Sequence, residues 1–224
     1  MTIAIHQPNY IPWLGYFDKI RNSDIFVFLD DVQYVKGTVA NRNYIKGQNG
    51  EKVLLSVPVM LSKGAFQRYN EIQIDYSQNW QQKHLNQLKN AYYHAPNFNL
   101  IITEFEAIIK QKHKNLADLN IQLIKWMMEK MDIKTTTVCS SALNIEVLDK
   151  NERNLAICKR LKATTYLSGK GAQSYNDPII FERNGIQLVV NQFQLLEYSQ
   201  LHGEFLDNLS GLDYLFNHSN IFHF

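Results

Sequence analysis

The stretch TIAIHQPNYIPWLGYFDKIRNSDIFVFLDD (residues 2–31) decides the fold class. Residues 2–5 are β-prone and run into a proline, which cannot donate a hydrogen bond to a strand ladder. Residues 13–21 directly follow a second proline, a residue that is favoured where helices begin. Residues 25–29 form a continuous apolar run, which is typical of a strand buried on both faces. The order strand, helix, strand predicts a βαβ unit, and therefore a parallel sheet with a right-handed crossover.

The rest of the chain continues with strand-like and helix-like segments. Apolar stripes of helical period run through three segments between residues 77 and 131, which we expect to be helices. We expect further strands at 53–59, 72–75, 134–138, 164–167 and 186–190, and helix caps at Ser77 and Asn151. The prediction is an α/β fold with a Rossmann-like, mostly parallel sheet. Residues 1–224 would form a single domain with an inserted helical subdomain at about 77–131.

The charge balance and the cysteines narrow the class of protein. The net charge is only +2, from 23 basic and 21 acidic residues, which argues against DNA or an anionic membrane as partner. No apolar run approaches the ~20 residues of a membrane span, and the start does not resemble a signal peptide, so we expect a cytoplasmic protein. Cys139 and Cys158 have apolar neighbours and are interpreted as packed, reduced thiols. Neither lies in a zinc-binding pattern, and no metal site is predicted.

Polar residues follow three of the predicted strands. In open α/β sheets, ligands bind outside the carboxyl ends of the strands. We therefore expect the working site at this edge of the sheet. The residues concerned are His6, Asp30, Asp31, Ser168, Gly169 and Lys170.

Several roles are open for these side chains. His6 could act as a general acid or base near neutral pH, could donate to a phosphate, or could be structural. Asp30 and Asp31 could hold a metal, orient His6, bind ribose hydroxyls or cap a turn, and only one should face the site because strand neighbours alternate. Arg42, in a polar stretch, could clamp a carboxylate or phosphate, or be a solvated loop residue.

The segment SGKGA (residues 168–172) has only a weak likeness to a phosphate loop. It fails the Walker pattern, because Thr164 stands where the first glycine is required and Gly171 follows Lys170. A small anion cradle of backbone N–H groups is still open. The GxSxG, HExxH and GxGxxG motifs are absent, which argues against the commonest hydrolases, metalloproteases and dinucleotide-binding enzymes.

The block HQPNYIPWLGYFDKI (residues 6–20) resembles the WbqC-like protein family. Shorter matches extend the likeness over nearly the whole chain. They are FVFLDDVQY (26–34), NRN (41–43), the helix of Trp80, YLSG (166–169), EF (204–205) and LSGLDYLFN (209–217). One departure is His218, because members of the family often have a glycine there.

The resemblance implies a function in bacterial surface polysaccharide synthesis. Members occur among genes for O-antigen and related polymers, and some have been suggested to transfer glycine or a related acyl group to an amino sugar. The implied activity is that of an acyltransferase acting on a sugar nucleotide or amino sugar, with an acyl-carrier or aminoacyl donor as partner. The resemblance implies no particular cofactor.

In such a reaction His6 would take the proton of the sugar amine, and Asp30 or Asp31 would orient His6. Asn9, Tyr10 or backbone N–H groups would stabilise the oxyanion, and Arg42 or Lys170 would hold a diphosphate. The residues expected to bind substrate are Gln7, Asn9, Tyr10, Trp13, Gln33, Arg42, Ser168, Gly169 and Lys170.

Two alternatives stay open. One is nucleotidyl transfer, since nucleotidylyltransferases also place a histidine-bearing loop between the first strand and a helix. Here Asn9 and Tyr10 replace the second histidine of that pattern, so the likeness is one of fold only. The other alternative is a non-catalytic module that binds a sugar or a carrier.

Overall fold

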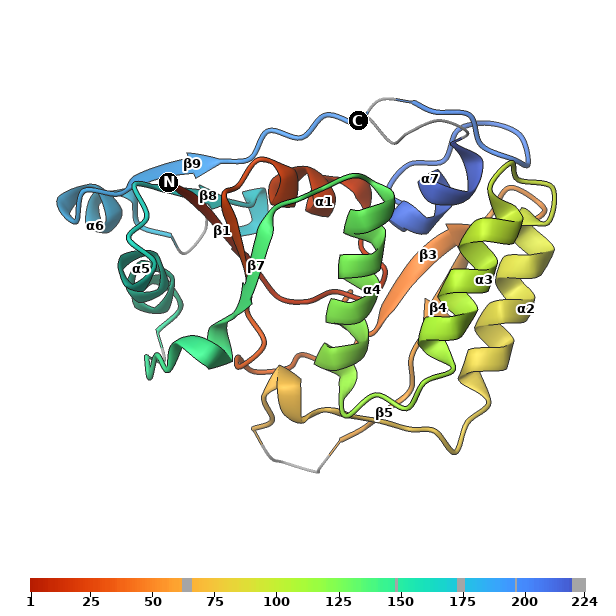
Figure 1. Cartoon of the computed structure of the whole chain (residues 1–224), viewed down its shortest axis with the longest axis horizontal. Helices are drawn as coiled ribbons and strands as arrows, with labels where there is room; N and C mark the ends of the chain where they lie inside the picture. Colours follow the sequence, from red (N-terminus) through yellow and green to blue (C-terminus); the bar gives the residue numbers. More distant parts are fainter. Residues whose placement is uncertain (62–65, 148, 173–175, 196, 219–224) are drawn as a thin grey trace. The chain divides into compact units, whose positions relative to one another are not determined.

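The computed structural model describes residues 1–61, 66–147, 149–172, 176–195 and 197–218 (Figure 1). The chain divides into two compact units, and each is described by itself. The first unit consists of Met1–Gln7, Gly15–Asp31 and Ile133–Gln194, and the second of Pro8–Leu14, Val32–Asp132 and Leu195–Phe224. The organisation as a single domain with a helical insertion stays a prediction.

A five-stranded, all-parallel sheet is the centre of the first unit. In spatial order its strands are β7 (Thr136–Cys139), β2 (Ile25–Phe28), β1 (Thr2–His6), β8 (Thr165–Ser168) and β9 (Gln187–Val190). The predicted α/β fold with a Rossmann-like parallel sheet is confirmed. The opening βαβ unit is also as predicted, with the helix α1 at Leu14–Arg21.

Helices cover both faces of this sheet, as parallel sheets require. Tyr16 of α1 packs against Phe26 of β2, with ring centroids 5.4 Å apart. On the opposite face Ile5 packs in a buried cluster with Ile157 of α5 (Lys150–Arg160) and Phe181 of α6 (Pro178–Arg183). Strand neighbours point to opposite faces, so His6, next to Ile5, faces α1.

The start of α5 corrects one prediction. The N-cap is Asp149 rather than Asn151, because the Asp149 carboxylate accepts hydrogen bonds from the backbone N–H groups of Asn151 and Glu152, both at 2.9 Å. Asp149 therefore satisfies two of the amide donors that have no partner inside the helix.

The second unit combines helices with two small antiparallel sheets. Its helices are α2 (Trp80–Tyr92), α3 (Phe98–Ile109), α4 (Leu116–Lys130) and α7 (Gly211–Asn217). Its strands are β3 (Arg42–Lys46) with β4 (Lys52–Ser56), and β5 (Val59–Met60) with β6 (Gln73–Ile74). The predicted strands at 53–59 and 72–75 thus pair locally and do not extend the parallel sheet. The polar stretch around Arg42 is a strand rather than a loop, because a tight turn at Gly47–Gly50 folds it back onto β4.

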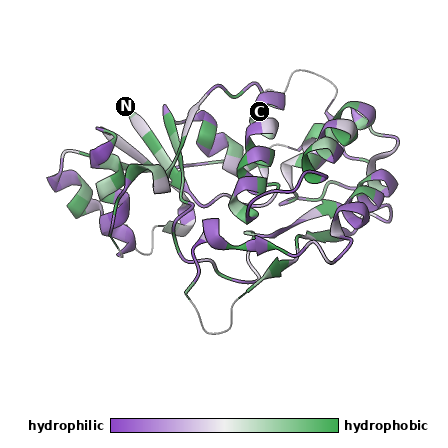
Figure 2. Ribbon diagram, turned by 60° about the horizontal axis from the view of Figure 1, so that its bottom comes forward, coloured by the Kyte–Doolittle hydropathy of each residue, from purple (hydrophilic) through white to green (hydrophobic). Residues whose placement is uncertain are grey.

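The three consecutive helices have buried stripes where the sequence places them. Trp80, Phe105 and Leu119, one from each helix, are at most 4% exposed. In Figure 2, hydrophobic and hydrophilic residues alternate along the helix ribbons. Ser77 does not cap α2: the helix begins after Asn79, and the Ser77 hydroxyl donates to Asp75.

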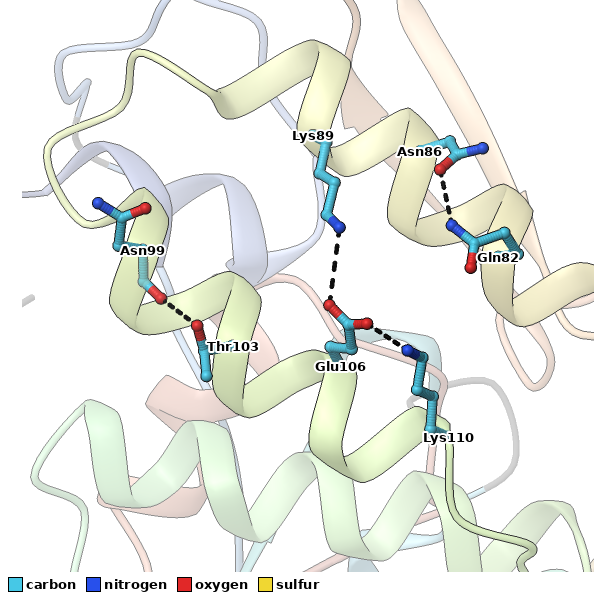
Figure 3. A network of polar contacts seen from close by, with 7 residues as sticks. All are labelled: Gln82, Asn86, Lys89, Asn99, Thr103, Glu106 and Lys110. Carbon is cyan, nitrogen blue, oxygen red and sulfur yellow. Dashed lines mark hydrogen bonds and ion pairs between the residues drawn. The ribbon is translucent and has the colours of Figure 1, made fainter.

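Polar contacts join the exposed sides of α2 and α3 (Figure 3). Glu106 lies 3.7 Å from Lys89 of α2 and 2.5 Å from Lys110, at the end of its own helix. Such exposed pairs add little stability, so packing of the buried stripes holds these helices. In the part of the chain that the structure describes, no helix is long and apolar enough to cross a membrane.

Candidate functional site

The sheet of the first unit has one topological switch point. From β1 the chain passes through α1 to β2 on one side, whereas from β8 it passes through α6 to β9 on the other side. The two helices lie on opposite faces, so the connections diverge at the carboxyl ends of β1 and β8. Open α/β sheets bind ligands at this place. His6 ends β1 and Ser168 ends β8, so two residues predicted for the site flank the switch point.

The two strands separate at this point. The pairing of β1 with β2 continues to His6, whereas its pairing with β8 ends at Ala4 and Leu167. The Ile5 carbonyl lies just beyond the last pair with β8. It accepts a hydrogen bond of 2.8 Å from Lys19 Nζ of α1. A lysine side chain therefore lies where the ladder between the two central strands opens.

His6 is held in one orientation by two neighbours. Its ring lies edge-on to Tyr16, with centroids 4.9 Å apart, and its Nδ1 is 3.0 Å from the Gln7 carbonyl oxygen. A carbonyl can only accept, so we assign the proton of the neutral ring to Nδ1, and Nε2 carries the lone pair. Burial, followed by the charge of Lys19, lowers the pKa of His6 to about 3, against a smaller opposing effect of the Gln7 carbonyl. His6 is therefore a neutral hydrogen-bond acceptor at neutral pH.

Lys19 is the residue that the sequence analysis missed. Its side chain is 5% exposed, and burial lowers the pKa of its amine to about 7. A Cβ atom placed on Gly169 would lie 3.8 Å from Lys19 Nζ, so this glycine borders the amine. The spacing in the sequence could have indicated that Lys19 points inward. It lies three residues after Tyr16, and residues at this spacing share one face of a helix.

Asp30 and Asp31 join the ends of β2 and β7. The Ser140 hydroxyl donates to Asp31 at 2.5 Å and lies 3.1 Å from an Asp30 oxygen. Asp30 also accepts from the backbone N–H and the hydroxyl of Ser141, at 3.0 and 2.7 Å. β2 ends at Phe28, so strand alternation does not govern these two residues, and both carboxylates contact Ser140. That only one of them faces the site stays a prediction.

The segment after β8 contains Ser168 and Lys170. The Ser168 hydroxyl accepts from Asn176 at 2.8 Å, and Ser168 is 1% exposed. Lys170 is exposed and starts a short 3-10 helix. A Cβ on Gly171 would meet no atom within 4 Å, so close packing against other parts of the protein does not require a glycine at this position. Among the described residues, no three His, Cys, Asp or Glu side chains are grouped so as to hold a metal ion.

The remaining predicted site residues divide between the units. Gln7 belongs to the first unit, and the second contains Asn9, Tyr10, Trp13, Gln33 and Arg42. Tyr10 is fully buried, and its hydroxyl lies 2.9 Å from His84 Nδ1. Arg42 donates to the carbonyl of Gly37. Tyr10 and Arg42 therefore each have a structural partner within the second unit.

The loop that contains Asn9 and Tyr10 is held through its backbone carbonyls. Asn120 donates to the Pro8 carbonyl at 2.7 Å, and Asn43 donates to the Ile11 carbonyl at 2.9 Å. Ile11 has φ of +36°, a conformation that β-branched residues rarely adopt. Such strain persists only where surrounding contacts impose it, and it concentrates at functional sites.

Comparison with known proteins identifies the family. The sequence profile of the WbqC-like protein family matches residues 7–221, which is nearly the whole chain. The chain belongs to the WbqC-like protein family. It is 35% identical over 218 residues to "Uncharacterized protein Rv1507c" of Mycobacterium tuberculosis (strain ATCC 25618 / H37Rv), and the alignment covers 96% of this chain and 93% of that protein. No solved structure matches this WbqC-like chain.

Proposed function

We propose that this WbqC-like protein is a cytoplasmic transferase of surface polysaccharide synthesis that moves a small acyl group, glycyl in the first instance, onto an amino sugar. The observation that carries the proposal is the lone pair of His6 Nε2 at the switch point of the sheet. An acyl transfer to an amine needs a neutral acceptor for the proton that the amine loses. His6 is unprotonated throughout the neutral pH range, since its pKa is lowered to about 3, and it becomes an effective base only when substrate binding raises that pKa.

The proposed step balances without a further reactant. The sugar amine attacks the acyl carbon and forms the new amide bond. The bond between the acyl carbon and the leaving group of the donor breaks. The proton lost by the amine passes to His6 Nε2 and from there to the leaving group. The Nδ1–H bond to the Gln7 carbonyl fixes the tautomer that this step uses.

Asp30 and Asp31 have a positioning role in this proposal. They bind Ser140 and Ser141, so they fix the end of β2 beside His6, whose strand partner is Phe28. A direct contact that orients the imidazole, as in a catalytic triad, is not among the described hydrogen bonds. The Gln7 carbonyl supplies that orientation instead.

Four of the other predicted residues, Gln7, Ser168, Gly169 and Lys170, belong to the first unit with His6 and keep their proposed role in binding. Asn9, Tyr10, Trp13, Gln33 and Arg42, of the second unit, stay predictions from the sequence alone. Of these, Tyr10 has the weakest support, since its buried hydroxyl already bonds His84.

The test is a screen for product by mass spectrometry. The purified protein is incubated with a panel of amino-sugar nucleotides and with activated glycine, as thioester and as adenylate. The expected result is an amino-sugar nucleotide heavier by one glycyl group, which does not form with heat-denatured protein. Release of pyrophosphate from a nucleoside triphosphate with strict Mg²⁺ dependence would instead indicate nucleotidyl transfer. Ligand binding without turnover of any donor would indicate a non-catalytic binding module.

A further inference from the structure

Lys19 is a buried cation without a counter-ion among the described residues. Its ammonium group has three N–H donors, and the Ile5 carbonyl, at 2.8 Å, accepts from one of them. None of the ion pairs in the described part of the chain includes Lys19. Buried polar groups are nearly always hydrogen-bonded. In its ammonium form, Lys19 therefore has two N–H donors without a partner among the described residues.

The nearby carboxylates are already engaged. Asp18, on the same helix, accepts from Asn191 at 2.7 Å and from Asn22 at 3.1 Å. Asp30 and Asp31, after β2, accept from Ser140 and Ser141. These hydrogen bonds come from neutral groups, and none of the three carboxylates forms an ion pair with Lys19 among the described residues. Lys19 is therefore left without an ion-pair partner in this part of the chain, a place that an anionic ligand would take.

Gly169 borders the amine. Outside the adjoining residues, a Cβ at this position would have Lys19 Nζ as its single neighbour within 4 Å, at 3.8 Å, which is ordinary van der Waals contact. In open α/β sheets, ligands bind outside the carboxyl ends of the strands, and Gly169 directly follows β8 at this edge.

We propose that Lys19 Nζ binds a phosphate oxygen of the substrate, in the diphosphate of a sugar nucleotide. The choice of a sugar nucleotide rests on the proposed function, whereas the anionic nature of the ligand rests on Lys19 alone. Phosphate oxygens supply the acceptors for the two remaining N–H groups, and their charge balances the ammonium. From the sequence, Arg42 or Lys170 is expected to hold the diphosphate. Neither is a buried amine at the switch point.

Anion binding at Lys19 also tunes His6. The positive charge of Lys19 is one of the causes that lower the pKa of His6. A bound phosphate neutralises this charge and raises the pKa of His6, which makes Nε2 a stronger base. The proton acceptor is then most effective when substrate is in place.

The test uses P1,P2-dimethyl diphosphate, whose two charges do not titrate between pH 6 and 8.5. Its affinity is measured by 31P NMR titration for the wild type, Lys19→Met, Lys19→Arg and the exposed control Lys159→Met. If only the ammonium form binds, wild-type affinity falls by about 30-fold from pH 6 to pH 8.5, since the pKa of Lys19 is about 7. Lys19→Met should lose binding, Lys159→Met should keep it, and Lys19→Arg should bind with little pH dependence.

Two results would overturn the inference. One is equal affinity of the wild type and a folded Lys19→Met variant. The other is no measurable binding by the wild type at pH 6. The outcome is independent of the acyl-transfer assay: diphosphate binding that requires Lys19 would stand even if no glycyl product forms. Conversely, if the protein transfers glycyl groups but does not bind the probe, the proposed function would be supported and the anion site at Lys19 would be contradicted.

Discussion

Lys19 Nζ donates a 2.8 Å hydrogen bond to the Ile5 carbonyl from within the buried face of α1. A buried ammonium without a carboxylate partner destabilises the folded protein. For the same reason, burial lowers the pKa of Lys19 to about 7. The unfolded chain keeps its proton up to a pKa near 10.4, so between pH 7 and that value it binds more protons than the folded protein. Stability from this group is therefore present at high pH and is lost as the pH falls to 7.

The first prediction is that Lys19→Met stabilises the protein more at pH 6 than at pH 9. The advantage should shrink by about 2.7 kcal/mol between these values, because wild-type Lys19 is neutral at pH 9. Urea unfolding of both proteins at the two pH values measures it, with exposed Lys170→Met as the control. An advantage that does not depend on pH would show that Lys19 is not a buried, titrating amine.

The second prediction concerns Ser140, whose hydroxyl contacts both Asp30 and Asp31. Ser140→Ala removes the donor to the half-buried Asp31 carboxylate and the acceptor of the buried Asp30 N–H. We expect a loss of about 1–3 kcal/mol in the free energy of unfolding. Ser77→Ala, an exposed serine that also contacts a carboxylate, should lose less. Equal losses would mean that the link between β2 and β7 does not stabilise the sheet edge.

The third prediction concerns Asn43, which donates to the carbonyl of Ile11, the residue with φ of +36°. Asn43→Ala should cost about 1–3 kcal/mol, since a buried carbonyl loses its donor and the strained loop loses a restraint. Thermal unfolding measures this, and Tyr44→Ala, 41% exposed on the same strand, is the control. If both variants unfold at the wild-type temperature, the loop conformation does not depend on Asn43.

The fourth prediction concerns Trp126 of α4. The side chain is 8% exposed and its Nε1 donates to Glu104 of α3 at 2.6 Å. Trp126→Ala should therefore cost about 3–5 kcal/mol in chemical denaturation. A loss below about 1 kcal/mol would be typical of a surface residue and would remove Trp126 from the core of the second unit.

The sequence predicts the parallel sheet well, because its strands are short apolar runs with polar ends. It also places His6 correctly at the end of β1. It does not predict that β3 and β4 pair with each other as a hairpin. This pairing depends on the turn at Gly47–Gly50, and the polar residues of β3 are as typical of a loop as of a strand. The sequence also misplaces the N-caps of α2 and α5, because more than one Asp, Asn or Ser residue lies near the start of each helix.

The candidate site was predicted only in part. Strand ends can be recognised in sequence, so the polar residues at the carboxyl edge could be found. The sequence does not show that Tyr10 contacts His84 or that Arg42 donates to Gly37, because these residues come together only in the folded chain. Lys19 was missed because a lysine in an amphipathic helix is usually exposed. Only the packed structure shows that this one points to the sheet.

The most direct test of the account is steady-state turnover of His6→Asn with the substrates that the product screen identifies, paired with thermal unfolding. Asparagine keeps a polar side chain but exchanges no proton near neutral pH. The account predicts a fall in turnover of about 10²–10⁴-fold at an unchanged melting temperature. Unchanged turnover in a fully folded His6→Asn protein would contradict it and would remove His6 from the mechanism.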